Sequence, residues 1–182
     1  MNKNIEQRGG VETMLEVIYP LLDKLAMMWI AGSVKDVHEK FVSHLIKRKC
    51  DVEIDKTEST RDETFLIYLP EGESNDLSLN FLHLIIKVKG FKVINIGKDV
   101  SIFDIAEVIH IKNPEYIFTI INDSMDDGQY KKYVELISNE VSTAKIILSG
   151  ITPIRVELDN ELAQKVQIVA SSEETIEMLD SL

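Results

Sequence analysis

Cysteine is almost absent from this sequence, since Cys50 is the only one among 182 residues. A single cysteine excludes an internal disulfide and any metal site built from several cysteines, and it is typical of proteins kept in a reducing compartment. The sequence also lacks a signal peptide and any apolar run long enough to span a bilayer. These absences predict a cytoplasmic protein that makes no contact with a membrane.

Positive charge is scarce as well, with 20 Lys and Arg against 31 Asp and Glu, a net charge of −11. The excess is uneven: residues 1–60 carry 9 basic and 10 acidic groups, whereas residues 61–182 carry 11 and 21. A chain this acidic is a poor binder of phosphate groups through bulk electrostatics. Its one basic cluster, residues 47–49, is more often a solvated helix face than a DNA contact.

Apolar residues at helical spacing occupy the N-terminal part of the chain. They recur over residues 11–31, where Pro20 predicts a kink or a break. They recur again from Val34 onward, with Ser33 as the expected N-cap of a second helix. We therefore expect an antiparallel helical hairpin. Because two helices bury little by themselves, the hairpin must pack on the rest of the chain, on a second copy, or on helices outside this sequence.

Strands and helices alternate in the remainder of the chain, and near-continuous apolar strands are typical of a parallel sheet covered on both faces. The sequence thus predicts an α/β fold with a helical cap over residues 1–54, a polar linker over 55–63, and a five-stranded, doubly wound, flavodoxin/Rossmann-like domain over 64–182. The expected strands are 64–69, 92–96, 116–121, 145–149 and 166–169; the expected helices are 76–89, 101–112, 128–141 and 172–181, with a short one near 157–163.

The loop from Pro70 to Ser78, PEGESNDLS, follows the first expected strand, and ligands bind beyond the carboxyl ends of the strands in such sheets. Its acidic and amide side chains fit a ligand or metal loop. They also fit the start of the next helix, capped by Asn75 or Asp76, and on the residues alone we favour capping. The loop lacks a glycine-rich turn and a Gly-Lys-Ser/Thr motif, so it is not a phosphate loop.

Catalytic combinations of residues are also missing. The four histidines do not neighbour one another at metal-ligand spacing, and no Ser/His/Asp or Cys/His set stands out, so we expect a protein without enzymatic activity. Asp123, Asp126 and Asp127 leave a receiver-like signalling domain as an alternative, although no Lys ends a later strand as a phosphoryl partner. Trp29 is either a core residue or the lid of a flat cofactor, and Cys50 is a small filler rather than a reactive thiolate.

Two segments carry a resemblance to a known family: YPLLDKLAMMWIAGSVKDVHEKFVSHLIKRK, and FLIYLPEGESNDLSLNFLHLIIKVKGFKVINIGKDVSIFDIAEVI. They resemble the cobalamin-binding C-terminal region of MerR-type transcriptional regulators, including the light-sensing, adenosylcobalamin-dependent repressors. In that family a helical bundle covers the upper face of the corrin ring, and a flavodoxin-like domain supplies a histidine to cobalt. The resemblance implies a ligand-sensing and oligomerisation module whose N-terminal hairpin is part of a four-helix bundle.

The family's bundle motif is a Trp, nine residues, and then Glu-His. Trp29 and Glu39 match this motif, but Lys40 follows where the His is expected. The loop motif after the first strand is Glu-x-His-x-x-Gly. Here Glu73 matches, and Asn75 and Ser78 replace the His and the Gly. The later positions correspond to Thr119 in the third strand and to Ser149-Gly150 in place of a Gly-Gly pair. The resemblance makes these the cofactor-binding positions: Trp29, Glu39, Glu73, Asn75, Ser78, Thr119, Ser149 and Gly150.

The two replacements in the loop change what the site can bind. An asparagine amide is a weak donor to cobalt compared with imidazole, and a serine side chain takes space that the family's glycine leaves free. We therefore expect a degenerate site without histidine ligation and without a protein-bound metal. Cobalamin with its own base on cobalt, another ligand, or no ligand remain open.

Partner expectations follow from the same comparison with the family. The segment before Val11 is too short for a DNA-binding domain, so we expect DNA contact only through a domain absent from this chain. The apolar stripes of an incomplete bundle predict a homo-oligomer. The alternative function is a corrinoid-binding carrier protein that serves a methyltransferase.

Overall fold

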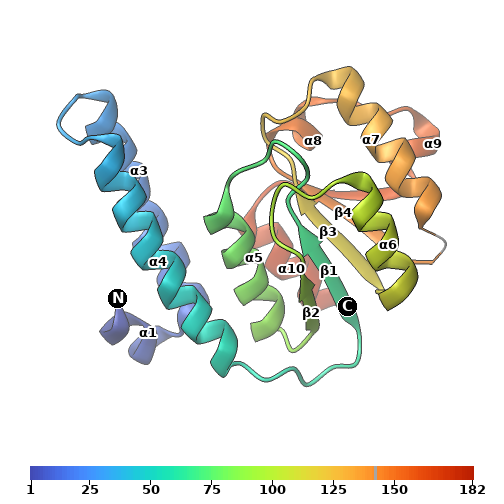
Figure 1. The fold of residues 1–182 in the computed structure, drawn as a ribbon. Coiled ribbons are helices and arrows are strands. Elements are labelled where there is room, and N and C mark those ends of the chain that lie inside the picture. Colours follow the sequence, from blue (N-terminus) through green and yellow to red (C-terminus); the bar gives the residue numbers. More distant parts are fainter. Residues whose placement is uncertain (142) are drawn as a thin grey trace.

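The computed structural model describes residues 1–141 and 143–182. A helical hairpin projects beside an α/β body in Figure 1, and the two parts are joined by the loop that follows α4. The N-terminal part consists of α1 (Asn2–Arg8), α2 (Gly10–Thr13), a π-helical turn η1 (Met14–Ile18), α3 (Tyr19–Ile30) and α4 (Asp36–Lys56).

Pro20 explains the π-helical turn. A proline inside a helix removes one hydrogen bond and pushes against the carbonyl of the residue four positions earlier. Here the helix widens just before the proline, and the Tyr19 N–H donates to the carbonyl of Met14, five residues back. Pro20 then sits in the first turn of α3, where its missing N–H costs little. The expected break is therefore a widened turn, and helix continues on both sides of it.

The body is built on a parallel sheet, five-stranded within the described residues, in the order β2-β1-β3-β4-β5. Its strands are β1 (Thr64–Tyr68), β2 (Lys92–Asn95), β3 (Tyr116–Ile120), β4 (Lys145–Ser149) and β5 (Val166–Val169). All five lie within the runs predicted from the sequence. The fold class is thus confirmed, because near-continuous apolar strands can be buried on both faces only in such a layered arrangement.

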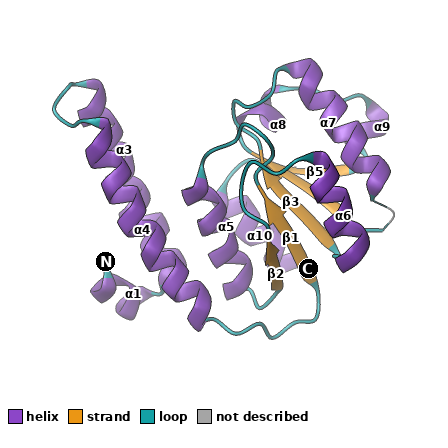
Figure 2. Ribbon diagram, in the orientation of Figure 1, coloured by secondary structure: helices purple, strands orange, loops and turns teal. Residues whose placement is uncertain are grey.

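Helices cover both faces of the sheet, as the orange strands between purple helices show in Figure 2. They are α5 (Asp76–Val88), α6 (Ile102–Lys112), α7 (Asp127–Glu140), α8 (Ile151–Arg155), α9 (Asn160–Ala163) and α10 (Ser172–Ser181). Side chains alternate along β1, so that Phe65 and Ile67 join one core and Leu66 and Tyr68 join the other.

The hairpin is not a separate body, because it shares a core with one face of the sheet. Ile46, Cys50 and Ile54 of α4 are buried in the same cluster as Phe81 and Ile85 of α5. No helix in the described part of the chain is both long and apolar enough to cross a membrane.

Three local features of the structure differ from what the sequence predicted. α4 begins at Asp36 with Lys35 as its N-cap, so the expectation that Ser33 caps it is wrong. The His38 ring accepts a hydrogen bond from the Lys35 N–H at 3.0 Å, which closes this turn without a serine. The short helices α1 and α8 were not predicted, because segments of five to seven residues carry too little periodicity to be recognised.

Candidate functional site

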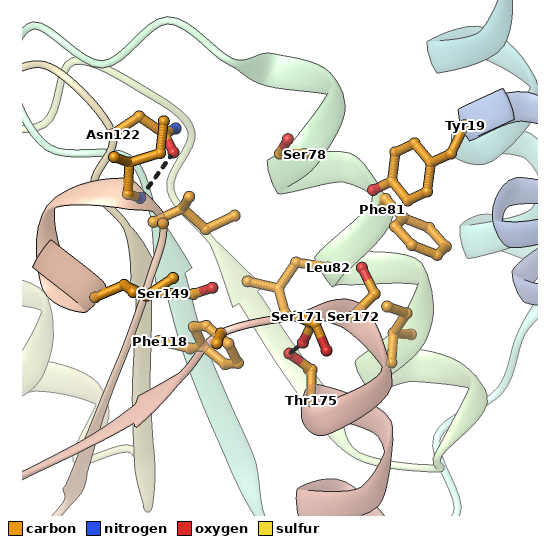
Figure 3. A pocket seen from close by; sticks show the side chains of 16 residues that line it. Tyr19, Ser78, Phe81, Leu82, Phe118, Asn122, Ser149, Ser171, Ser172 and Thr175 are labelled. Carbon is orange, nitrogen blue, oxygen red and sulfur yellow. Dashed lines mark hydrogen bonds between the residues drawn. The ribbon is translucent and has the colours of Figure 1, made fainter. Parts of the chain in front are cut away.

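A cavity of about 300 Å³ opens at the carboxyl ends of β3 and β4, between α5, α8 and the start of α10 (Figure 3). We call it the slot. Its floor is apolar, with Phe81 and Leu82 from α5 and Phe118 from β3. None of the residues that line it carries a charged side chain. Its rim is polar and is formed by Ser78, Asn122, Ser149, Ser171, Ser172 and Thr175. Such a space suits an uncharged group that has both apolar and hydrogen-bonding parts.

Tyr19 closes the slot on the side of the hairpin. Its ring meets Phe81 edge-on, with 5.2 Å between the ring centroids. Burial raises the pKa of the Tyr19 hydroxyl to about 12, although a hydrogen bond with Ser172 opposes this. The hydroxyl is therefore neutral near pH 7, and it can both donate and accept hydrogen bonds at the mouth of the slot.

Glu73 is present in the loop after β1, but it does not line the slot. Its buried carboxylate accepts hydrogen bonds from the N–H groups of Asn122 and Ser124, in the loop after β3. The side chain thus ties together two loops at the carboxyl edge of the sheet. This role is structural, because both hydrogen bonds go to the protein's own backbone.

Asn75 is the N-cap of α5, as favoured from the sequence. Its side-chain oxygen accepts a hydrogen bond from the Ser78 N–H at 3.2 Å. The exposed amide is therefore turned back on its own helix. Ser78 lines the slot, and its side chain takes up part of the space at that edge.

The third and fourth strands place their predicted residues differently. Thr119 is buried, and its hydroxyl donates to the Tyr68 carbonyl at 2.9 Å. Its neighbours Phe118 and Ile120 line the slot instead, because successive strand residues face opposite sides of a sheet. Ser149, at the end of β4, does line the slot.

Gly150 also lines the slot, and its backbone explains why the residue is a glycine. It has φ of 107°, a region that side chains rarely adopt. A Cβ here would lie 2.3 Å from the carbonyl oxygen of Ile121. Gly150 therefore lets the turn after β4 lie directly against the end of β3, next to the slot.

Trp29 and Glu39 lie near the end of the hairpin, on α3 and α4, and both are exposed. Trp29 keeps 54% of its surface accessible, so its interpretation as a core residue is wrong. It lies on the same stripe of α3 as Leu22, seven residues earlier, which packs against the shared core. Trp29 thus lies on the same side of α3 as a residue that packs on the core, but the described structure does not enclose it.

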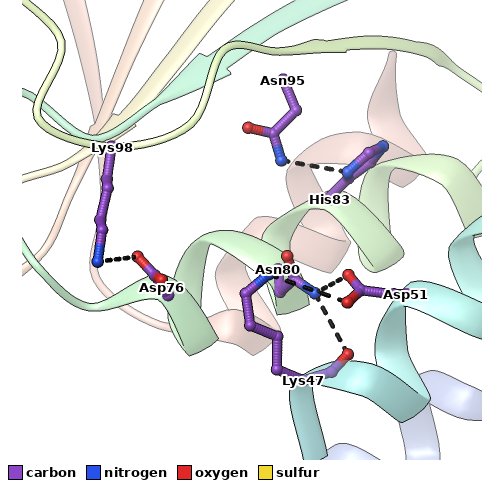
Figure 4. A network of polar contacts seen from close by, with 7 residues as sticks. All are labelled: Lys47, Asp51, Asp76, Asn80, His83, Asn95 and Lys98. Atoms are coloured by element: carbon purple, nitrogen blue, oxygen red, sulfur yellow. Dashed lines mark hydrogen bonds and ion pairs between the residues drawn. The ribbon is translucent and has the colours of Figure 1, made fainter. Parts of the chain in front are cut away.

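A second polar cluster was not predicted from the sequence. It joins α4, α5 and the end of β2 (Figure 4). The buried amide of Asn80 donates to Asp51 at 2.6 Å, and Asn95 contacts the His83 ring at 3.3 Å. Burial, and Lys87 nearby, lower the pKa of His83 to about 4, although Asp51 and Asp55 oppose this. The ring is therefore neutral near pH 7 and accepts from Asn95.

The receiver-like alternative gains no support from the aspartates after β3. Asp126 caps α7 by accepting from the Gln129 N–H at 2.8 Å, and Asp127 pairs with Arg155 at 3.0 Å. Within residues 1–141 and 143–182, no group of His, Cys, Asp or Glu side chains is arranged to hold a metal ion.

Cys50 behaves as a small filler residue. It is buried in the shared core, 3.6 Å from the sulfur of Met14. Burial is the main reason that the pKa of its thiol is raised to about 11. The thiol is therefore protonated near pH 7 and shielded, which argues against the reactive thiolate considered from the sequence.

Several residues of the slot escaped prediction. Tyr19, Ser171 and Ser172 lie far from the first loop in sequence and form no recognisable motif. Asn122 could have been proposed, because it directly follows β3 at the edge where ligands bind. The others come together only through the packing of α3 and α10 against α5.

Comparisons with known proteins concern the fold. No protein-family model matches the sequence, and no curated protein is similar enough to count as a match. Solved structures do match. The monomethylamine corrinoid protein of Methanosarcina barkeri has a TM-score of 0.71 at 12% identity, over 99% of this chain and 88% of that one.

Two further structures are similar over most of the chain. The methanol:cobalamin methyltransferase complex MtaBC of Methanosarcina barkeri gives a TM-score of 0.54 at 12% identity, over 97% of this chain and 69% of that one. A cobalamin-binding protein from Desulfitobacterium hafniense DCB-2 gives 0.52 at 15% identity, over 88% and 77%. At such identities the likeness establishes a common fold: a helical part followed by the Rossmann-like sheet of cobalamin-binding proteins.

Proposed function

We propose that this chain is a ligand-sensing module with the fold of cobalamin-binding proteins, and that it does not bind cobalt through a histidine. The observation that carries the proposal is that a slot is formed while Asn75 serves as the N-cap of α5. The slot offers a space of about 300 Å³, lined by uncharged residues, at the carboxyl edge of the sheet, where ligands bind in such folds. At the position of the family's histidine, the amide caps α5 instead.

The residues present fit a corrinoid only in part. Phe81, Phe118 and the serines of the rim would hold a flat side group of the cofactor in the slot. The protein supplies no imidazole beside it, and the Asn75 oxygen is already engaged. Cobalamin, when bound, would supply a cobalt centre, but this chain's own residues contribute binding and orientation rather than a metal ligand.

The proposed context is a MerR-type transcriptional regulator. The residues that support it are the Trp29–Glu39 spacing on the hairpin and the retained Glu73, as in the family resemblance. In this context DNA is bound through a domain outside the chain, and the module acts in the cytoplasm without catalysing a reaction. The acidic body, with 11 basic and 21 acidic groups over residues 61–182, suits a sensor better than a DNA contact.

A corrinoid carrier for a methyltransferase is the second candidate. It is favoured by the similarity to a monomethylamine corrinoid protein over 99% of this chain, which includes the helical part. The replacement of histidine by Asn75 weighs against it, since a carrier needs a reactive, well-held cobalt.

A titration followed by visible absorption tests the proposal. Hydroxocobalamin and adenosylcobalamin are added to the intact chain, and free and bound cofactor are separated by gel filtration. We expect binding without the spectrum of histidine-ligated cobalt. A tight complex with that spectrum would contradict the loss of ligation and favour the carrier.

The substitution Asn75→His provides the complementary experiment. If the slot still accepts the cofactor, the new imidazole should increase the affinity at least tenfold and bring in a histidine-ligated spectrum. Asn75→Asp serves as the control, because aspartate keeps the helix cap and adds no imidazole. An unchanged affinity in a folded Asn75→His variant would show that the slot does not receive cobalamin.

A further inference from the structure

The helical hairpin has a second apolar surface that no part of the described chain covers. On α4, Val37, Phe41, Leu45 and Val52 are 63%, 62%, 43% and 45% exposed. They recur on one side of the helix, whereas Ile46, Cys50 and Ile54 face the body on the opposite side. We call these four residues the outer stripe of α4. The hairpin exposes further apolar side chains on α3: Leu21, Met27 and Met28.

We infer that the outer stripe of α4 binds a second copy of this chain, so that two hairpins form one four-helix bundle around a twofold axis. Apolar residues at this spacing are the packing surface of helix bundles. Arg48 lies on the same side of α4, between Leu45 and Val52. Even so, a monomer rarely leaves a large apolar surface in water.

The size of the surface agrees with a dimer interface. α4 has 21 residues, which corresponds to a length of about 30 Å. Two neighbouring helices are about 20 Å wide. A hairpin face of this size buries about 600 Å² per copy, or about 1,200 Å² in total, the lower end of the range for stable interfaces.

Charge argues for a copy of the same chain at this position. Residues 1–60, which contain the hairpin, carry 9 basic and 10 acidic groups and are nearly neutral. The body, residues 61–182, carries 11 and 21, so contact between two bodies would be opposed by repulsion. A dimer joined through the hairpins brings the neutral parts together and keeps the acidic bodies apart.

The test is the molar mass in solution, measured by light scattering on the intact chain at high micromolar concentration. Wild type should have twice the chain mass of 20.7 kDa. Phe41→Glu and Leu45→Glu should each halve the mass, because a carboxylate in the centre of an apolar interface is left unpaired. Both positions are exposed, so the circular dichroism spectrum and the melting temperature should stay close to those of wild type.

Phe103→Glu is the matched control. Phe103 lies on α6 and is 83% exposed, so this variant adds the same charge to an exposed phenylalanine of the body and should remain a dimer. A monomeric wild type, or a dimer that persists in Phe41→Glu, would overturn the inference. The result is independent of the cobalamin titration, because the outer stripe and the slot share no residue.

Discussion

At the scale of single residues, the slot depends on one glycine that has no freedom to change. Gly150 combines φ of 107° with a carbonyl 2.3 Å from where a Cβ would be placed. In the sequence, the family resemblance made this glycine a cofactor-binding position, but it did not indicate what the backbone there lies against. The backbone lies against Ile121, directly after β3, and only the packing of two strand ends could reveal this contact.

We expect Gly150→Ala to destabilise the protein by ~3 kcal/mol or more, from backbone strain together with the steric overlap. Chemical denaturation measures the loss. Gly128→Ala is the control: Gly128 lies in the first turn of α7, and its added Cβ would lie 3.4 Å from a carboxylate oxygen of Asp126. This control should be neutral or stabilising by up to ~1 kcal/mol. Equal effects at the two positions would argue against the close contact at Ile121.

The helix cap formed by Asn75 gives a second prediction at this scale. Asn75→Ala should lower the free energy of unfolding by ~1 kcal/mol, because the Ser78 N–H loses its acceptor. Asn75→Asp should retain most of the stability, and Asn160→Ala controls for an exposed asparagine without this hydrogen bond. A fully stable Asn75→Ala variant would mean that the amide is free to serve a ligand.

At the scale of elements, prediction succeeded where local pattern decides structure. The five strands were found because each is a short apolar run between turns. The packing of α3 and α4 against α5 was not predicted, since nothing local indicates that Tyr19 meets Phe81 or that Asn80 meets Asp51. For the same reason the cofactor-binding positions were only partly brought together: Ser78, Ser149 and Gly150 line one cavity, whereas Trp29 and Glu39 stand apart.

The junction of α4, α5 and β2 should make stability depend on pH. His83 has a pKa of about 4 in the folded protein against 6.5 unperturbed. Between these values the unfolded chain binds a proton that the folded chain does not, so stability falls as the pH drops from 6.5 toward 4. The loss stays below the ~3 kcal/mol of a fully buried group, because solvent reaches part of the ring.

Comparison of wild type with His83→Gln by urea denaturation at pH 7 and pH 5 isolates this effect. Wild type should lose more stability on acidification than the variant, since both contain the same surrounding carboxylates. His110→Gln is the control, because His110 is exposed and contacts Glu140 at 3.2 Å. An identical pH dependence in wild type and His83→Gln would contradict the lowered pKa.

At the scale of the whole molecule, the negative charge is concentrated in the body, while the outer stripe of α4 lies on the nearly neutral hairpin. The body contributes most of the net charge of −11, and the hairpin contributes the exposed outer stripe. The composition alone revealed the uneven distribution of charge. The exposure of the outer stripe required the structure. A sequence shows that a helix has an apolar side, but not whether other elements cover that side.

This distribution predicts an unusual response to salt. If the hairpins associate and the acidic bodies repel, raising the ionic strength should screen the repulsion and tighten the dimer. Sedimentation equilibrium at low and high salt would show a lower dissociation constant at high salt. An interface held together by ion pairs would weaken instead, which would be incompatible with the apolar outer stripe.

The π-helical turn at Met14–Ile18 also determines how the helix that follows it, α3, is rotated about its own axis. Each residue of a helix turns the chain by about 100°, and a π turn inserts one residue without interrupting the helix. Deleting a single residue from this turn would rotate α3 by about 100° relative to the helix that precedes the turn. Trp29 lies beyond the turn, on α3, and would rotate with the rest of the helix. The direction in which the tryptophan points is therefore fixed about three helical turns before it, by the residue count ahead of Pro20.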